Sequence, residues 1–242
     1  MARGRSNAST ISGNTAGGMG GGIFNAGTLT LANSTISGNS TNRVGGGIYK
    51  VESASTILIF CTLYDNSAAK GGSSLGSNTG DLAATSQGPL VMRNSLVAGK
   101  HGDPGPDIVG TIITGGYNLL QTVDPATTTF RDPDHQHATD MINLDLSSFL
   151  DATLRSNPGP DGKPAFTQTL ALLKGASNPA IDAIPEAECV ITISVTDTDG
   201  KPVTDPVTKQ PITITTDHDQ RGVTRPQGNA CDIGAYEWVP TG

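Results

Sequence analysis

Residues 132–140 hold the densest group of metal-binding and acid–base side chains in the sequence. The group consists of Asp132, Asp134, His135, His137 and Asp140. Carboxylates and imidazoles bind divalent cations or transfer protons. The group is therefore the candidate metal site, and Asp134, His135 and His137 are also candidate catalytic residues. Their spacing matches no familiar helical or zinc pattern, which favours a solvated polar loop.

The tripeptide Asp217-His218-Asp219 is a second candidate for acid–base chemistry. A carboxylate beside a histidine orients the imidazole ring and lets it act as a general base. His218 and Asp219 are thus further candidate catalytic residues. The tripeptide leads directly into an Asp-Gln-Arg-Gly sequence at residues 219–222, and this context favours a structural role.

The motifs of known polysaccharide-cleaving β-proteins are missing from the sequence. Glycoside hydrolysis needs two placed carboxylates, yet neither the paired aspartates and Arg-x-Lys of polygalacturonase-like hydrolases nor the pattern of pectate lyases occurs. The formal net charge of −7 suits a polyanionic substrate poorly unless calcium bridges the two. We expect no cofactor, with calcium as the one possibility, and a protein without enzymatic activity.

The composition excludes several other classes of protein. Hydrophobic residues make up 35% of the chain and charged residues only 15%, whereas disordered chains combine low hydrophobicity with high net charge. No run of Lys or Arg offers a nucleic-acid surface. No stretch reaches the eighteen or so apolar residues of a membrane span, and no signal peptide precedes the repeats.

An internal repeat of 25 residues dominates the first half of the chain. The sequence Ser-Thr-Ile-Ser-Gly-Asn at residues 9–14 returns at residues 34–39, and Gly-Gly-Gly-Ile-Phe at 20–24 returns as Gly-Gly-Gly-Ile-Tyr at 45–49. Apolar residues alternate within each copy, as at residues 29–36, which is typical of strands. Such short units cannot bury an apolar face alone, so they must stack.

These observations predict an all-β fold, a single-stranded right-handed parallel β-helix of seven to nine rungs. The glycine triplets suit corners with positive φ or close backbone approach. Asn14, Asn39 and Asn66 recur at equivalent corners, where asparagine tolerates left-handed φ and where stacked side chains can form a ladder.

We expect one continuous domain with three parts. Residues 1–125 form Gly- and Asn-rich rungs, residues 126–188 form a long excursion and further rungs, and residues 189–242 form a C-terminal cap. Two alternating segments, 190–195 and 211–215, predict a β-hairpin inserted in this cap. Residues 197–200, Asp-Thr-Asp-Gly, hint at a calcium loop but lack its other ligands, which favours a hairpin turn.

The C-terminal motifs resemble a known family. Residues 219–222, the Arg225-Pro226 pair and Cys-Asp-Ile-Gly-Ala-Tyr-Glu at 231–237 look like the closing signature of the choice-of-anchor Q-type domain of bacterial surface β-helix proteins. Residues 94–99, 116–120 and 175–182 are similar to the rungs before that signature. The Gly-rich half is also similar to repeats of polymorphic outer-membrane proteins and pectin-lyase-like β-helices.

The resemblance implies export and surface attachment, and it implies no common chemistry. The sequence departs from the family by its insertion at about residues 190–216 and by ending without a sorting tail. Five charged residues of the signature are expected to form a structural ion-pair network that ties the tail across the last rung: Asp219, Arg221, Arg225, Asp232 and Glu237.

The three cysteines divide into a pair and a single residue. Cys189 and Cys231 bracket the inserted hairpin, and in an exported protein a disulfide between them would add about 3–4 kcal/mol of stability. Cys61 replaces the serine of the earlier repeats beside Phe60 and Leu63. This environment favours a small buried residue in a strand over a reactive thiol.

The sequence thus predicts a secreted or cell-surface bacterial β-helix module that is adhesin-like and binds an extracellular polysaccharide or cell-surface glycan. The alternative is a polysaccharide lyase or glycoside hydrolase that uses residues 132–140 or 217–221. An ice-binding function is disfavoured, because Thr28 and Thr30 are followed by Ser53 and Ser55 one period later. The oligomeric state and the mode of anchoring are left open.

Overall fold

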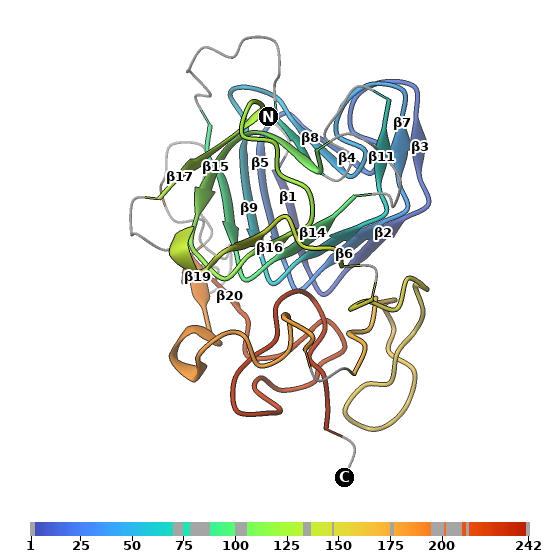
Figure 1. The fold of residues 1–242 in the computed structure, drawn as a ribbon, viewed down its shortest axis with the longest axis vertical. Helices are drawn as coiled ribbons and strands as arrows, with labels where there is room; N and C mark the ends of the chain where they lie inside the picture. The colour runs from blue at the N-terminus through green and yellow to red at the C-terminus, as the bar shows by residue number, and fades with distance from the viewer. Residues whose placement is uncertain are drawn as a thin grey trace.

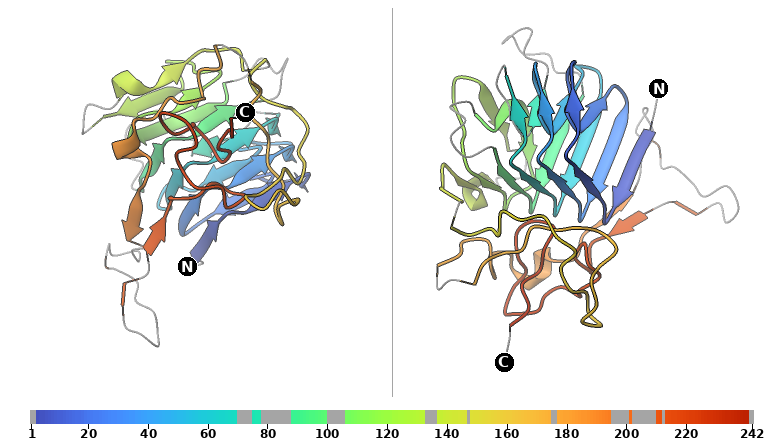
Figure 2. Two further views of the ribbon diagram at one scale, coloured as in Figure 1. Left: turned by 90° about the horizontal axis from the view of Figure 1, so that it is seen from below. Right: turned by 90° about the vertical axis from the view of Figure 1, so that its right-hand side faces the viewer.

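The chain forms the predicted parallel β-helix, with a C-terminal segment packed along its side (Figure 1). The computed structural model describes residues 3–69, 75–77, 88–99, 106–132, 137–146, 148–174, 177–194, 201, 210–211 and 213–240. Figure 2 shows the strands of successive rungs side by side, with the C-terminal segment beneath them. All strand pairs of the solenoid are parallel.

Two of the four stacks of strands meet at one long strand, β15. The first stack, sheet A, contains β1 (Arg3–Asn7), β5 (Thr28–Ala32), β9 (Ser55–Ile59), β13 (Leu90–Arg93), β15 (Ile108–Thr114) and β17 (Thr128–Arg131). The second stack, sheet D, contains β4 (Ile23–Asn25), β8 (Ile48–Lys50) and β12 (Leu75–Ser77), and it also ends on β15.

The other two stacks are separate sheets. Sheet B contains β2 (Thr10–Ser12), β6 (Thr35–Ser37), β10 (Thr62–Tyr64), β14 (Leu96–Ala98), β16 (Leu119–Leu120) and β18 (Met141–Ile142). Sheet C contains the two-residue strands β3 (Thr15–Ala16), β7 (Ser40–Thr41) and β11 (Ser67–Ala68). Each rung supplies one strand to sheet B, so the described residues form six rungs, fewer than the seven to nine predicted.

The repeat period sets the register between rungs. Thr10 pairs with Thr35 and Ile23 pairs with Ile48, so in the first two rungs residues 25 apart in the sequence lie directly above one another. The side chains that point inward form the solenoid core, which includes Leu31, Ile36 and Leu58. Stacking therefore turns a repeated sequence position into a column of like side chains.

One corner of each early rung depends on a residue with left-handed backbone. Gly13, Gly38 and Asp65 have φ of 68°, 65° and 54°. The prediction that the asparagines adopt this conformation was wrong, because the residue before each asparagine does so. The turn at that residue leaves the asparagine side chain directed along the stack.

The asparagines form the predicted ladder. Asn14 donates to Asn39 Oδ1 from its backbone N at 3.0 Å and from Nδ2 at 2.9 Å. Asn39 donates in the same way to Asn66 Oδ1, at 3.0 and 2.9 Å. Asn39 and Asn66 are fully buried, whereas Asn14 is exposed. The ladder satisfies polar groups that burial would otherwise penalise.

The glycine triplets allow close approach between rungs, as predicted. Gly20 and Gly45 have φ of 75° and 72°. A Cβ atom on Gly21 would lie 2.2 Å from the carbonyl oxygen of Gly46 in the next rung. No other residue type fits there without moving the backbone.

The described residues between 144 and 240 leave the solenoid and build a second core on its side. This core joins outward-facing residues of sheets A and B, such as Ile59, Leu96 and Leu119, to Leu146 and Ile233 of the C-terminal segment. The pairings described between residues 144 and 191 are isolated antiparallel bridges, including Leu150 with Leu172. The further rungs predicted within 126–188 are therefore confined to β17 and β18, among the residues that the structure describes.

The inserted hairpin is present. β19 (Thr192–Ser194) pairs antiparallel with β20 (Thr213–Thr215), and its predicted turn at 197–200 lies outside the described residues. The helical content described is two 3-10 turns, η1 (His137–Thr139) and η2 (Glu186–Glu188). Neither is long and apolar enough to cross a membrane.

The ladder gives a stability test. The variant Asn39→Ala should lower the free energy of unfolding by about 1–3 kcal/mol, because it removes the acceptor for Asn14 and one of the two donors to the buried Asn66 Oδ1. Urea denaturation measures this loss. The control is Asn14→Ala at the exposed end of the ladder, and equal losses in both variants would contradict the role of burial.

Candidate functional site

Residues 217–238, here called the C-terminal clamp, hold most of the charged residues that the sequence analysis selected. The clamp runs along the outer face of sheet B and spans several rungs (Figure 2). The sequence analysis placed this segment across the last rung. It lies along the side instead, because its hydrogen-bonding partners are threonines of successive rungs.

The outward threonines of sheet B form the docking column for the clamp. Gln220 Nε2 donates to Thr10 Oγ1 at 3.0 Å, and Thr35 Oγ1 donates to Gln220 Oε1 at 2.6 Å. One glutamine amide therefore bridges two rungs. In the third rung, Thr62 Oγ1 accepts a hydrogen bond from Ala235 N at 2.9 Å.

Arg225 is the buried cation at the centre of the clamp. Its Nη1 lies 2.6 Å from Glu237 Oε2, and its Nη2 donates to the carbonyl oxygen of Gly234 at 2.8 Å. The guanidinium also lies 4.1 Å from the ring centroid of Phe60, at a corner of the solenoid. Arg225 thus ties parts of the clamp together through its charge, and it joins the clamp to the solenoid corner at Phe60 through a cation–π contact.

Arg221 and Asp219 form a second buried ion pair, 2.7 Å apart. Asp219 also accepts hydrogen bonds from the backbone N of Val223 and of Glu237, at 2.9 and 3.0 Å. Arg221 lies over the ring of Tyr236, 3.6 Å from its centroid. In the Asp-Gln-Arg-Gly sequence, Asp219 therefore accepts hydrogen bonds, Gln220 bridges two rungs and Arg221 stacks on an aromatic ring.

Asp232 and Glu237 are close, buried carboxyl groups. Glu237 Oε2 accepts from the backbone N of Asp232 at 3.1 Å, and Asp232 Oδ1 accepts from Asp182 N at 2.8 Å. Burial, followed by the charge of Glu237, raises the pKa of Asp232 to about 7. Burial also raises the pKa of Glu237, against the opposing charge of Arg225.

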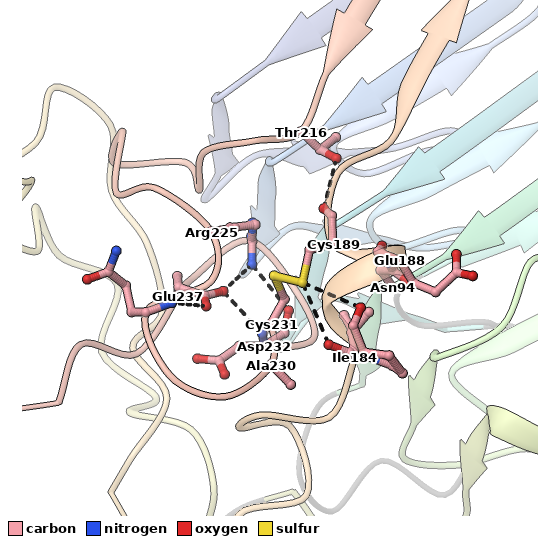
Figure 3. The surroundings of a disulfide bond; sticks show 12 residues. Asn94, Ile184, Glu188, Cys189, Thr216, Arg225, Ala230, Cys231, Asp232 and Glu237 are labelled. Carbon is pink, nitrogen blue, oxygen red and sulfur yellow. Dashed lines mark hydrogen bonds and ion pairs between the residues drawn. A yellow bond between two sulfur atoms is a disulfide. The ribbon is translucent and has the colours of Figure 1, made fainter.

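A disulfide joins Cys189 and Cys231, with a Cα–Cα distance of 5.6 Å. Figure 3 shows this bond beside Arg225, Asp232 and Glu237. Backbone hydrogen bonds between Ile184 and Cys231, at 2.8 and 2.9 Å, hold the same two segments together. The disulfide and the ion-pair network therefore stabilise the same region of the clamp.

The candidate metal residues do not converge in the described part of the chain. Asp140 accepts from Thr114 Oγ1 at 2.7 Å and from Asn118 N and Nδ2 at 2.9 and 3.0 Å, so it closes a corner of the solenoid. Asp132 is partly buried. His137 begins η1, and Asp134 and His135 lie outside the described residues.

No group of three His, Cys, Asp or Glu side chains is placed to hold a metal ion among the residues that the structure describes. Within residues 132–140, the described part consists of Asp132, the short helical turn η1 and the corner residue Asp140.

His218 and Asp219 differ in how far their side chains are buried. His218 Nδ1 lies 3.0 Å from Asp217 Oδ1, and about half of each side chain is exposed. Asp219 is buried against Arg221. The pair Asp217–His218 is thus a surface contact exposed to solvent, whereas Asp219 is buried and paired with Arg221 inside the clamp.

Cys61 is fully buried, and burial raises the pKa of its thiol to about 12. This agrees with the predicted unreactive residue. Its position is the corner before β10 rather than within a strand. Its Sγ lies 3.5 Å from the carbonyl oxygens of Leu31 and Ile59.

Several residues of this site were missed by sequence reasoning. Thr10, Thr35 and Thr62 carry no signal beyond their repetition on the polar side of alternating strands. Asp182 was expected only as part of a rung, yet its Oδ1 accepts from Ala230 N at 3.1 Å and lies against Gly228. Outside this site, sequence reasoning also missed Lys50, a buried lysine on β8 that donates to the carbonyl oxygen of Ala54 at 3.1 Å.

Comparison with protein families, with curated proteins and with solved structures finds no match for this chain.

The buried arginine gives a direct test of the clamp. The variant Arg225→Met should lower the free energy of unfolding by about 3–5 kcal/mol, because it leaves Glu237 buried without its cation. Adding Glu237→Gln should recover part of the loss. Chemical denaturation measures both values.

The matched control for Arg225 is Arg155→Met, which breaks the more exposed ion pair with Asp151 and should cost at most about 1 kcal/mol. Equal losses at positions 225 and 155 would show that the network does not hold the clamp.

The raised pKa of Asp232 predicts a dependence of stability on pH. Unfolded aspartate loses its proton near pH 4, whereas folded Asp232 keeps it until about pH 7. The folded state therefore binds this proton more tightly than the unfolded state, which adds up to about 4 kcal/mol to the free energy of unfolding below about pH 4. This contribution is lost as the pH rises from about 4 to about 7. The stability of Asp232→Asn relative to the natural chain should rise between pH 5 and pH 8.

Denaturation curves at several pH values test this dependence. The variant Asp217→Asn, at an exposed aspartate, controls for the loss of one charge. A stability difference for Asp232→Asn that stays constant from pH 5 to pH 8 would contradict the buried, proton-binding environment.

Proposed function

We propose that this chain is a non-enzymatic, adhesin-like β-helix module of a secreted or cell-surface protein, and that it binds glycans through the outer faces of its solenoid. One observation carries the proposal. The acidic residues of the C-terminal motif, Asp219, Asp232 and Glu237, are at most 3% exposed and are engaged by arginines and backbone amides. A polysaccharide has no access to them.

The enzymatic alternative requires two carboxyl groups that face one sugar ring. The accessible acid–base pair described in the site is Asp217 with His218 on the surface. Asp140, from the other candidate group, is occupied by Thr114 and Asn118. Because Asp140 and the acidic residues of the clamp are already bonded within the protein, a non-enzymatic scaffold is favoured over an enzyme.

The proposed location rests on two further points. The Cys189–Cys231 disulfide suits an oxidising compartment outside the cytoplasm. The resemblance of residues 219–222 and 231–237 to the choice-of-anchor Q-type signature supports attachment to a bacterial surface. In this reading the signature is the part that fastens the C-terminal segment to the solenoid.

The proposed binding face is the outside of sheet D. The C-terminal segment lies on the opposite side of the solenoid from β4 and β8 (Figure 1). There Phe24, which is 55% exposed, stacks on Tyr49 of the next rung with ring centroids 5.6 Å apart. The exposed ring of Phe24, packed on the buried ring of Tyr49, can supply the large apolar contact that binding sites use.

The test combines glycan binding with turnover. The purified chain is presented to a panel of uronic-acid and neutral polysaccharides, with and without calcium, while unsaturated products and reducing ends are followed. We expect binding without turnover. Phe24→Ala should weaken the binding several-fold, whereas Phe166→Ala, at a fully exposed phenylalanine of the C-terminal segment, should not.

Turnover that disappears in His218→Ala, His135→Ala or His137→Ala would overturn the non-enzymatic proposal and locate the active site. Absence of binding to every glycan of the panel would overturn the glycan-binding proposal. Binding that Phe24→Ala leaves unchanged would remove sheet D as the binding face.

A further inference from the structure

The hairpin of β19 and β20 has an outer face made of hydroxyl groups. Thr192 pairs with Thr215 and Ser194 pairs with Thr213, and side chains that are paired or two residues apart point to the same side of a sheet. All four residues are exposed. Thr192 Oγ1 and Thr215 Oγ1 lie 3.4 Å apart. The outer face therefore offers four neighbouring hydroxyl groups to solvent.

The other face of the hairpin is apolar and fixes it to the protein. Ile193 pairs with Ile214, which is buried. Ile193 and Ile191 pack against the second core, and Thr216 N donates to the carbonyl oxygen of Ile191 at 3.1 Å. Figure 2 shows the two strands at the margin of the molecule. The fold thus holds the hydroxyl face outward in an extended conformation.

Buried hydroxyl groups of the solenoid have structural partners that the hairpin face does not need. Ser34 Oγ donates to the carbonyl oxygen of Ala32 at 2.7 Å, and Ser95 Oγ donates to that of Arg93 at 2.9 Å. Exposed strands are commonly protected from pairing with other chains by charged side chains. None of the four side chains on the hairpin face is charged, so this protection has to come from another group.

The sequence of the insertion has the composition of a glycosylated segment. Residues 190–216 contain nine Ser or Thr residues, three Pro residues and no aromatic residue. Segments rich in Ser, Thr and Pro are typical carriers of O-linked glycans. The composition of the insertion and the exposure of its described strands therefore indicate the same modification.

From these observations we propose that the outer face of the hairpin is a site of O-glycosylation, with Thr192, Ser194, Thr213 and Thr215 as acceptors. The donor is a sugar diphosphate carried on a nucleotide or a lipid, and a glycosyltransferase of the cell catalyses the transfer. The hydroxyl oxygen forms a glycosidic bond to the anomeric carbon as the bond from that carbon to the diphosphate breaks. The diphosphate leaves with the electron pair, and the hydroxyl proton passes to a base of the transferase.

The attached sugars protect a weak element of the fold. A two-stranded hairpin is only marginally stable alone, and bulky hydrophilic sugars on its outer face keep other chains and proteases away from it. The inference rests on the proposed location of the chain outside the cytoplasm. It does not depend on glycan binding by sheet D.

Mass spectrometry of the chain purified from its native host tests the proposal, with the chain made by cell-free synthesis as the unmodified reference. The native chain should be heavier by whole sugar units, and alkaline β-elimination should remove the added mass. Fragmentation that keeps the glycans attached should place them on the hairpin face. A variant with valine at the three threonines and alanine at Ser194 should lose most of the added mass, and valine retains the preference for a strand.

Thr15→Val is the matched control, since Thr15 is an exposed strand threonine on sheet C, and it should leave the added mass unchanged. Circular dichroism checks that each variant is folded. An exported chain whose hairpin carries no sugar, or sugars found only outside residues 192–194 and 213–215, would overturn the inference and leave the proposed function standing. A chain that cell fractionation finds in the cytoplasm would overturn the proposed location and this inference together.

Discussion

Hydrogen bonding between consecutive rungs is the interaction on which the rest of this structure depends. Between the first two rungs it fixes residues 25 apart directly above one another, as for Thr10 and Thr35, and it aligns the later rungs at other spacings, as for Thr35 and Thr62. Each repeated side chain thereby becomes a column with its own environment. Inward columns such as Ile36 with Leu63 make the core. Asparagine columns complete the corners. The outward column of Thr10, Thr35 and Thr62 presents hydroxyl groups, and the C-terminal clamp hydrogen-bonds to them.

The clamp buries charged residues, and its hydrogen bonds make this burial possible. Arg225 and Glu237 are both removed from water, and such a pair is tolerated only when further hydrogen bonds complete it. The carbonyl of Gly234, the backbone N of Asp232 and the ring of Phe60 provide this completion. The same arrangement buries the carboxyl groups of Asp232 and Glu237 and occupies them with hydrogen bonds. Structure and proposed function are connected at this point, because acids that fasten the segment cannot also face a substrate.

The sequence was sufficient for the features that repeat and insufficient for those that depend on distant contacts. The period predicted the rungs, the register and the glycine corners, and alternation predicted the hairpin of β19 and β20. The charged motif was expected to act structurally, but its place on the side of the solenoid was not foreseen. The reason is that Thr35 meets Gln220 across 185 residues, and an outward threonine on a strand has the same pattern as a solvated one. The described residues contain fewer rungs than predicted, because described apolar segments after residue 144 belong to the second core.

Because Gln220 and Ala235 of the clamp hydrogen-bond to threonines of three successive rungs, the clamp and sheet B should unfold together as one unit. Native-state hydrogen exchange tests it most directly, by comparing the backbone amides of Asp232 and Ala235 with those of Ile36 and Leu63. The account predicts equal opening free energies for both groups, close to the free energy of global unfolding, since exchange at the clamp then requires loss of the whole fold. Exchange of the clamp amides at a much lower opening free energy, while those of sheet B stay protected, would contradict it.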